Sequence, residues 1–275
     1  MEMKRIVIFV GLLVALSLAA SAMAGPFTSK VANDEYAGGV VNGIPTAQQW
    51  NEYYPDIYEA INKVIGTNYS YNREVDHRFV DVDYVWKDLL DPAPIALIGL
   101  TAGNSNTLGY YTGLGTGSGK KSLVGPYTGF GYIGGDGSEN SPYLGTILSM
   151  PHQFGWYLES SSSSTTTYYS EPNLNDGGWG WDHMMTFSLP ELAGKKIWIK
   201  NSDDKVVSVD FTKNSYLLAW EDLPFNTSTG MLGDEDYNDM IYLVARVSPV
   251  PEPATMLLLG GGLIGLAAFR RRLQK

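Results

Sequence analysis

The fold of this chain is decided by the stretch Lys196-Ile-Trp-Ile-Lys-Asn-Ser-Asp-Asp-Lys-Val-Val-Ser-Val-Asp-Phe-Thr-Lys-Asn-Ser-Tyr-Leu-Leu-Ala-Trp220. It contains three short segments rich in β-branched and aromatic residues, separated by clusters of Asn, Ser and Asp that favour turns. These segments predict strands at Lys196–Lys200, Lys205–Phe211 and Ser215–Trp220. Short strands that recur about every 10 residues are typical of antiparallel sandwiches. The stretch therefore predicts a mainly β protein with an antiparallel, jelly-roll-like β-sandwich.

The same pattern extends outward from this stretch in both directions. We expect strands at His183–Leu189 and Met240–Val247, a bulged strand within Arg73–Leu90, and short strands at Ile95–Leu100, at Phe130–Ile133 and on either side of Pro151. The Ser/Thr run Glu159–Ser170 has the composition of a surface loop. Apolar residues at helical spacing predict one or two helices within Thr46–Ile65, ending at Gly66.

Composition agrees with this fold class and excludes some functions. The chain has 31 Gly, 18 Tyr and 7 Trp but no Cys, which excludes thiol chemistry and disulfides. The central region Gly25–Val250 keeps 13 of the 19 basic and 27 of the 29 acidic side chains. Such an acidic surface repels nucleic acid and attracts divalent cations, so we expect no nucleic-acid partner.

The N-terminus reads as a secretory signal peptide, residues 1–24. Lys4 and Arg5 form a basic region before the apolar run Ile6–Ala20, and Ala22-Met-Ala24 is a small-residue cleavage site. The mature chain is therefore expected to begin at Gly25, after cleavage at Ala24, on the far side of the inner membrane.

The C-terminus, residues 250–275, has three parts in order. Pro251-Glu-Pro253 is followed by an apolar run, Ala254–Phe269, and by the basic cluster Arg270–Arg272. As a helix the apolar run would span about 24 Å, and snorkelling Arg side chains make up the difference from a membrane core. We predict a transmembrane helix over 254–269 with its basic end in the cytoplasm.

This tail resembles the PEP-CTERM sorting signal of bacteria that make exopolysaccharide. The residues that carry the resemblance are Val250-Pro-Glu-Pro-Ala-Thr255, the Gly-rich membrane segment and the terminal Arg run. The resemblance implies an exosortase-type processing enzyme as partner, with Pro251, Glu252 and Pro253 as the processing signal. It also implies membrane anchoring before processing and a final place at the cell surface or in the extracellular matrix.

Between the two ends, an N-terminal part at 25–150, with a helix, strands and a Gly-rich loop, precedes a β-rich domain at 151–247 with an acidic stretch. Glu221 and Asp222 follow one predicted strand, and Asp234, Asp236, Asn238 and Asp239 precede the next. Oxygen ligands of this kind suit Ca²⁺. The stretch is no EF-hand, because Asp239 and Ala245 stand where that loop needs Gly and Glu. Turn capping and a solvated acidic loop are the alternative interpretations.

Residues 151–247 are also similar to an uncharacterised secreted domain of unknown function. Phe154-Gly-Trp-Tyr-Leu158, Trp181-Asp-His-Met-Met-Thr-Phe187, Tyr216-Leu-Leu-Ala-Trp-Glu-Asp-Leu223 and Asp234-Glu-Asp-Tyr-Asn-Asp-Met240 carry the similarity. It implies a β-rich extracellular domain with an acidic loop. The insert Phe225–Leu232 separates the two acidic halves and argues against Glu221 and Asp239 sharing one ion.

The sequence contains no recognisable catalytic set. It has no Gly-x-Ser-x-Gly elbow or zinc-binding His motif, and His77, His152 and His183 lie far apart. We therefore predict a non-catalytic surface or exopolysaccharide-matrix protein. The alternatives are a carbohydrate-binding module that uses Trp156, Trp179 or Trp181 and surface glycans, and, behind it, a polysaccharide-degrading enzyme with paired carboxylates.

Overall fold

The computed structural model describes part of the chain, and all of that part belongs to the unit Ser29–Val250. The described residues are 57–66, 80, 84–89, 92–131, 135–178, 180–228, 231–233 and 237–250. The predicted signal peptide with Ala24 and Gly25, and the tail from Pro251 with its predicted transmembrane segment, lie outside them. Within the described residues, no helix has the length and apolar character needed to cross a membrane.

The described chain is mainly β, as predicted. Its strands are β1 (Trp86–Asp88), β2 (Ala93–Tyr111), β3 (Lys121–Gly131), β4 (Tyr143–Leu148), β5 (Gln153–Ser161), β6 (Thr165–Tyr169), β7 (Met184–Ser188), β8 (Lys196–Lys200), β9 (Val206–Asp210), β10 (Ser215–Trp220), β11 (Phe225–Asn226), β12 (Met231–Leu232), β13 (Met240–Ala245) and β14 (Val247–Pro249). The helices in the described part are α3 (Ile57–Ile65) and the 3-10 turns η3 (Pro172–Leu174), η4 (Asp176–Gly178) and η5 (Pro190–Leu192).

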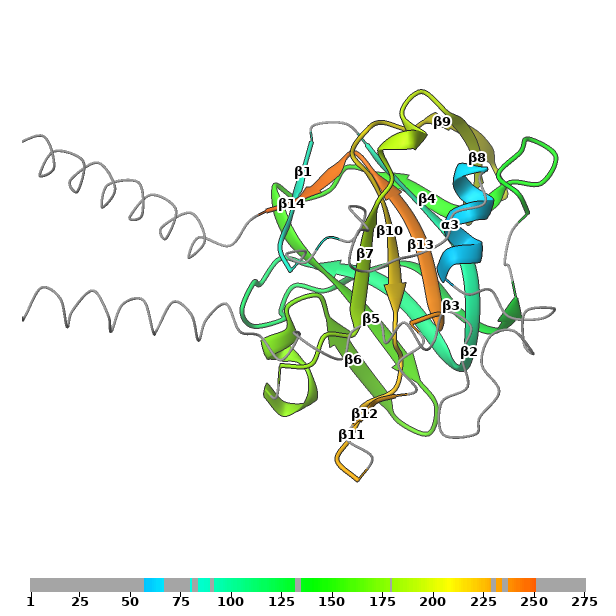
Figure 1. Cartoon of the computed structure of the whole chain (residues 1–275). Helices are drawn as coiled ribbons and strands as arrows, with labels where there is room; N and C mark the ends of the chain where they lie inside the picture. Colours follow the sequence, from blue (N-terminus) through cyan, green and yellow to red (C-terminus); the bar gives the residue numbers. More distant parts are fainter. Residues whose placement is uncertain are drawn as a thin grey trace, which may run out of the picture. The chain divides into compact units, whose positions relative to one another are not determined.

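Strand β2 connects the whole sheet (Figure 1). Its first half pairs with β13 and β4, and its second half pairs with β3 and β5. The sequence predicted only Ile95–Leu100 as a strand and treated the Gly-rich residues beyond as loop. That prediction was too short. Gly109, for example, pairs with Tyr157 of β5. A Cβ on residue 109 would stand 2.3 Å from the Tyr157 ring, so only glycine lets that ring pack against β2 at this position.

The pairings form a twelve-stranded sheet with the main path β14-β1-β5-β2-β13-β10-β7. Every pairing in it is antiparallel except that of β4 with β8. Buried residues from both halves of β2, from β10 and β13, and from β5 share one apolar core that includes Trp86, Trp156 and Trp220. The mainly β, largely antiparallel prediction is confirmed, and the jelly-roll-like arrangement of two sheets stays a prediction.

Several predicted elements can be compared with the structure directly. Strands β8 and β10 have the predicted bounds, and α3 ends as expected at Gly66, whose φ is 72° and whose N–H donates to the Asn62 carbonyl at 2.8 Å. The loop predicted at Glu159–Ser170 is wrong, because most of it belongs to β5 and β6. Tyr168 in β6 is buried, and this long-range packing outweighs the Ser/Thr composition.

Strands from both sides of residue 150 belong to the same sheet. Strand β1 pairs with β14, β2 with β13, and β4 with β8. The predicted parts 25–150 and 151–247 therefore contribute jointly to one folded body, and the acidic stretch is built on that shared sheet.

Candidate functional site

The acidic residues of the predicted site are brought together by strand register. In the antiparallel pair β10–β13, Trp220 lies opposite Met240. Glu221 follows β10 directly and Asp239 precedes β13 directly, so the two positions face each other just beyond the paired strands. The Asp222 backbone N–H donates to the Asp239 carboxylate at 2.7 Å, which closes this end of the ladder.

Three carboxylates meet at this end, and we call them the acidic cluster: Glu221, Asp222 and Asp239. One oxygen of each lies within 4.8 Å of one oxygen of the others. All three side chains are buried, with exposed fractions of 0%, 3% and 7%. Carboxylates this close repel one another unless protons, hydrogen-bond donors or a cation offset their charge. The ligand set is all oxygen, which is the type that Ca²⁺ selects.

The insert Phe225–Leu232 does not keep the two acidic halves apart, contrary to the expectation from sequence. Its ends form the two-stranded sheet β11–β12, in which Phe225 pairs with Leu232 and Asn226 with Met231. The two ends of a hairpin lie next to each other. The length of the insert therefore does not separate the residues that precede it from those that follow it. One carboxylate oxygen of Glu221 and one of Asp239 lie within 4.8 Å of each other despite the insert.

The structure places four of the six predicted metal ligands. The three members of the acidic cluster are brought together, and Asn238 is buried beside Asp239 in sequence. Asp234 and Asp236 lie outside the described residues.

Two asparagines from β2 complete the surroundings of Asp222. Asn106 Nδ2 donates to Asp222 Oδ2 at 2.6 Å, and Asn104 Nδ2 donates to Asp222 Oδ1 at 3.3 Å. Asn106 is fully buried, and its Oδ1 has no hydrogen-bond partner within the described structure. Sequence analysis missed both residues because it ended the strand at Leu100. Their spacing of two is a signal that they share a strand face.

Gly233 leaves the space that the Glu221 carboxylate occupies. A Cβ at position 233 would stand 2.1 Å from Glu221 Oε1, and the backbone φ of +53° is also one that favours glycine. The Leu223 N–H donates to the same oxygen at 3.1 Å. The Glu221 side chain is thus held in position by its own turn and by the glycine opposite.

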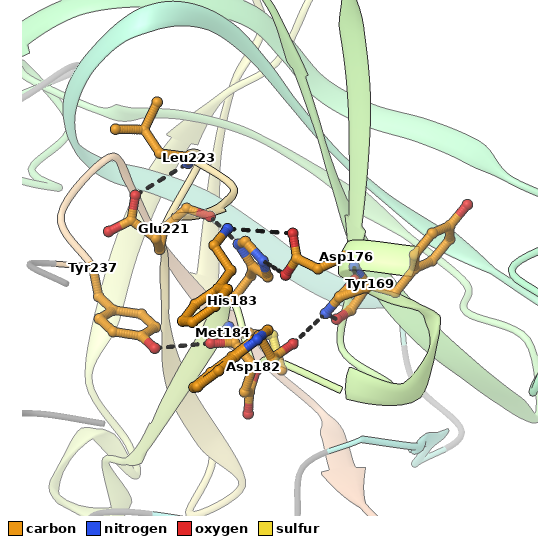
Figure 2. A network of polar contacts seen from close by, with 11 residues as sticks. Tyr169, Asp176, Asp182, His183, Met184, Glu221, Leu223 and Tyr237 are labelled. Carbon is orange, nitrogen blue, oxygen red and sulfur yellow. Dashed lines mark hydrogen bonds and ion pairs between the residues drawn. The ribbon is translucent and has the colours of Figure 1, made fainter. Parts of the chain in front are cut away.

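A buried histidine supports the backbone of the acidic cluster (Figure 2). His183 Nδ1 lies 3.0 Å from the Glu221 carbonyl oxygen, and Nε2 lies 2.8 Å from Asp176 Oδ2. The His183 carbonyl in turn accepts the Glu221 N–H at 2.9 Å. A carbonyl oxygen only accepts, so Nδ1 is the donor in that contact. His183 therefore positions the backbone of Glu221.

Two buried tyrosines, Tyr237 and Tyr168, contact the residues next to the acidic cluster. Tyr237 donates its hydroxyl to the Asp182 carbonyl at 2.8 Å, which fixes the segment that leads into Asp239. The Tyr168 ring stacks on His183 with a centroid distance of 3.9 Å. Burial, and then the negative charges of Asp176, Asp222 and Glu221, raise the pKa of the Tyr168 hydroxyl.

Two of the three tryptophans proposed for sugar binding pack against other aromatic side chains of the protein. Trp156 is fully buried in the core, where its ring lies edge-on to Phe154 and Trp86. Trp181 stacks on Phe225 with an interplanar angle of 12°. Trp179 lies outside the described residues. Trp156 contributes to the core, so it is unavailable as a sugar platform.

Comparison with known proteins identifies the tail. Residues 249–272 match the family model of the PEP-CTERM protein-sorting motif, which confirms the resemblance read from the sequence. A search of curated proteins finds no match to the chain. The chain is thus a mainly β protein that carries a PEP-CTERM sorting signal. This signal implies a secreted protein whose C-terminus associates with the membrane and is processed by an exosortase.

Proposed function

We propose that this protein is a non-catalytic component of the cell surface or exopolysaccharide matrix whose β domain is stabilised by Ca²⁺ at the acidic cluster. The observation that carries the metal proposal is the meeting of three buried carboxylates within 4.8 Å. The sorting motif at 249–272 supports the proposed destination. In this proposal the tail anchors the chain briefly, and the exosortase then releases the domain from the membrane.

Several features of the acidic cluster fit a calcium ion. Ca²⁺ takes six to eight oxygen ligands, so three carboxylates leave coordination positions for other groups. The buried Oδ1 of Asn106 is an acceptor without a hydrogen-bond partner in the described structure, and it belongs to an amide that contacts Asp222. The absence of a side chain at Gly233 leaves room for the Glu221 carboxylate. Asn238, Asp234 and Asp236 are the further candidates that the sequence offers.

An ion at this position would join three parts of the fold. Its ligands come from the end of β10, the start of β13 and the second half of β2. A divalent cation would also offset the mutual repulsion of the carboxylates, which are otherwise costly to bury together. The ion would therefore act on stability, and no step of a reaction is assigned to it.

Calorimetric titration of Ca²⁺ into the metal-free protein tests this proposal. We expect one ion to bind per chain, with release of heat, and we expect Asp239→Asn to weaken binding at least tenfold because it removes one charged ligand. Asp204→Asn is the matched control, since Asp204 is an exposed carboxylate paired with Lys200. Equal binding by both variants, or no binding by the wild-type protein, would show that the acidic cluster holds no calcium.

The sorting part has its own test, which is the intact mass of the protein recovered from its cells. A C-terminus near Pro251–Pro253 is expected after processing. A mass that still includes Phe269 and Lys275 would contradict removal of the tail.

A further inference from the structure

The sorting signal overlaps the folded sheet. The match to the motif begins at Pro249, which is the last residue of β14, and the Pro-Glu-Pro triplet begins directly after Val250. The Val250 N–H still donates to the Val85 carbonyl at 2.7 Å. No linker therefore separates the last hydrogen bond of the domain from the residues that a processing enzyme must recognise.

We call the two segments involved the latch: residues 85–89 around β1 and residues 246–250 around β14. They pair antiparallel, with Trp86 opposite Pro249 and Lys87 opposite Ser248. A second hydrogen bond, from the Leu89 N–H to the Arg246 carbonyl at 3.1 Å, closes the other end. Among the described strands, β14 pairs with β1 alone, so the latch is a short edge of the sheet.

The latch is held strongly at one end and weakly at the other. Val247 is fully buried, whereas Ser248 and Pro249 are only partly buried. The Ser248 hydroxyl donates to the carbonyl of its neighbour Pro249 at 3.2 Å. Beyond Ser248, the Val250 N–H pairs with the Val85 carbonyl at 2.7 Å. Edges of this kind open locally without unfolding the rest of a protein.

Arg246 provides a fixed point at the strong end. Its φ of 61° turns the chain from β13 into β14. Its guanidinium donates to the carbonyls of Pro92 and Asp210, both at 3.1 Å. Release of Ser248–Val250 would therefore leave Arg246 and Val247 in place.

We propose that the latch must open before the exosortase can bind the sorting signal, and this inference rests on the processing proposed above. One common way to recognise a peptide motif is to hold it as an extended strand through its backbone hydrogen-bonding groups, and this mode needs a backbone that is free to pair. In the folded domain, the backbone of residues 249–250 is already paired with β1. At about 3.6 Å per residue, Pro251–Pro253 spans only about 10 Å, which leaves little chain for an enzyme that does not disturb β14. The latch thus sets the rate of processing.

A disulfide across the latch tests this inference. Lys87 and Ser248 face each other at a hydrogen-bonded position of an antiparallel pair, where the Cα separation of about 5.5 Å suits a disulfide. The chain has no native cysteine to interfere. In a host that carries the exosortase, we expect Lys87→Cys with Ser248→Cys to slow conversion of precursor to mature protein at least tenfold. Each single variant should convert at the wild-type rate.

The matched control is a disulfide on another edge, Lys196→Cys with Asp210→Cys, which joins β8 to β9. It should leave processing unchanged. The converse variant, Lys87→Pro, removes a backbone donor that faces β14 without altering the motif, so it should speed conversion at least twofold.

The outcomes separate the two proposals. If the oxidised latch variant matures as fast as the wild-type protein, or if Lys87→Pro leaves the rate unchanged, the latch inference is wrong and the processing proposal stands. If the wild-type protein itself keeps its tail, both are wrong.

Discussion

The two ends of strand β13 are held in different ways. At its start, Asp239 belongs to a buried acidic cluster whose oxygens accept hydrogen bonds from the Asp222 backbone and from two β2 asparagines. At its end, Arg246 leads into a three-residue edge strand that pairs only with β1 among the described strands. The start is tied to buried side chains from distant segments, whereas beyond Val247 the chain is paired with β1 through a few backbone hydrogen bonds.

This difference shows how one strand can serve both stability and release. A buried charge that loses its partner carries the full cost of desolvation. The contacts of the acidic cluster are therefore expected to break only when the surrounding fold unfolds. An exposed edge returns its backbone groups to water when it opens, and its cost is small. The predictions below test this contrast, from the largest expected effect to the smallest.

The largest effect is expected at the acidic cluster. With calcium present, Asp222→Ala should lower the free energy of unfolding by about 3–5 kcal/mol, because it removes a charged acceptor and leaves the buried Asn106 amide without its partner. Urea unfolding measures this change. Asp204→Ala, at an exposed position, should have no measurable effect. Equal stability of the two variants would contradict a special role for this end of β13.

Removal of the metal should have the next largest effect. At a calcium concentration 100 times the Kd, a bound ion stabilises a protein by about 2.7 kcal/mol. For a domain of this size, chelation should therefore lower Tm by about 5–10 °C. Calorimetry with and without EDTA measures the shift, and Asp239→Asn, which is expected to weaken binding at least tenfold, should reduce the shift by about half or more. If the Tm of the wild-type protein is the same with calcium and with EDTA, calcium does not stabilise the domain.

A smaller effect is expected for Gly233→Ala. The new Cβ would collide with the Glu221 carboxylate, and the positive φ adds backbone strain, so stability should fall by about 1–3 kcal/mol. Gly194→Ala is the control, because its φ is +79° but no atom lies within 4 Å of a Cβ there. If the two variants lose equal stability in urea, the loss comes from backbone strain and the contact with Glu221 is unimportant.

The smallest global effect is expected at the latch. Ser248→Ala removes the hydrogen bond from the Ser248 hydroxyl to the Pro249 carbonyl, and it should change global stability by less than about 1 kcal/mol. Hydrogen exchange at the Val250 amide should nevertheless become faster. Ser122→Ala removes a hydroxyl contact with Tyr157 and is the control. Unchanged exchange at Val250 in Ser248→Ala would show that this bond does not hold the latch.

Local patterns in the sequence predicted the regular strands well and the irregular ones poorly. Strands β8 and β10 have alternating or apolar residues bounded by Asn, Ser and Asp, and both bounds were predicted correctly. Strands β2 and β6 are rich in Gly, Ser and Thr, and they were predicted as mostly loop. These segments are strands because they pair with neighbours and cover the core, which no local window contains.

The sequence by itself determined the sorting tail, the mainly β class and the acidic residues that are candidates for a metal, since each depends on residue types at short spacing. Tertiary structure decided which carboxylates meet, because strand register places Glu221 opposite Asp239 across a long insert. It also decided that Asn104 and Asn106 reach Asp222, and that Pro249 and Val250 belong both to the sorting signal and to the sheet. Contacts between distant segments arise from pairing and packing, and a linear motif does not contain that information.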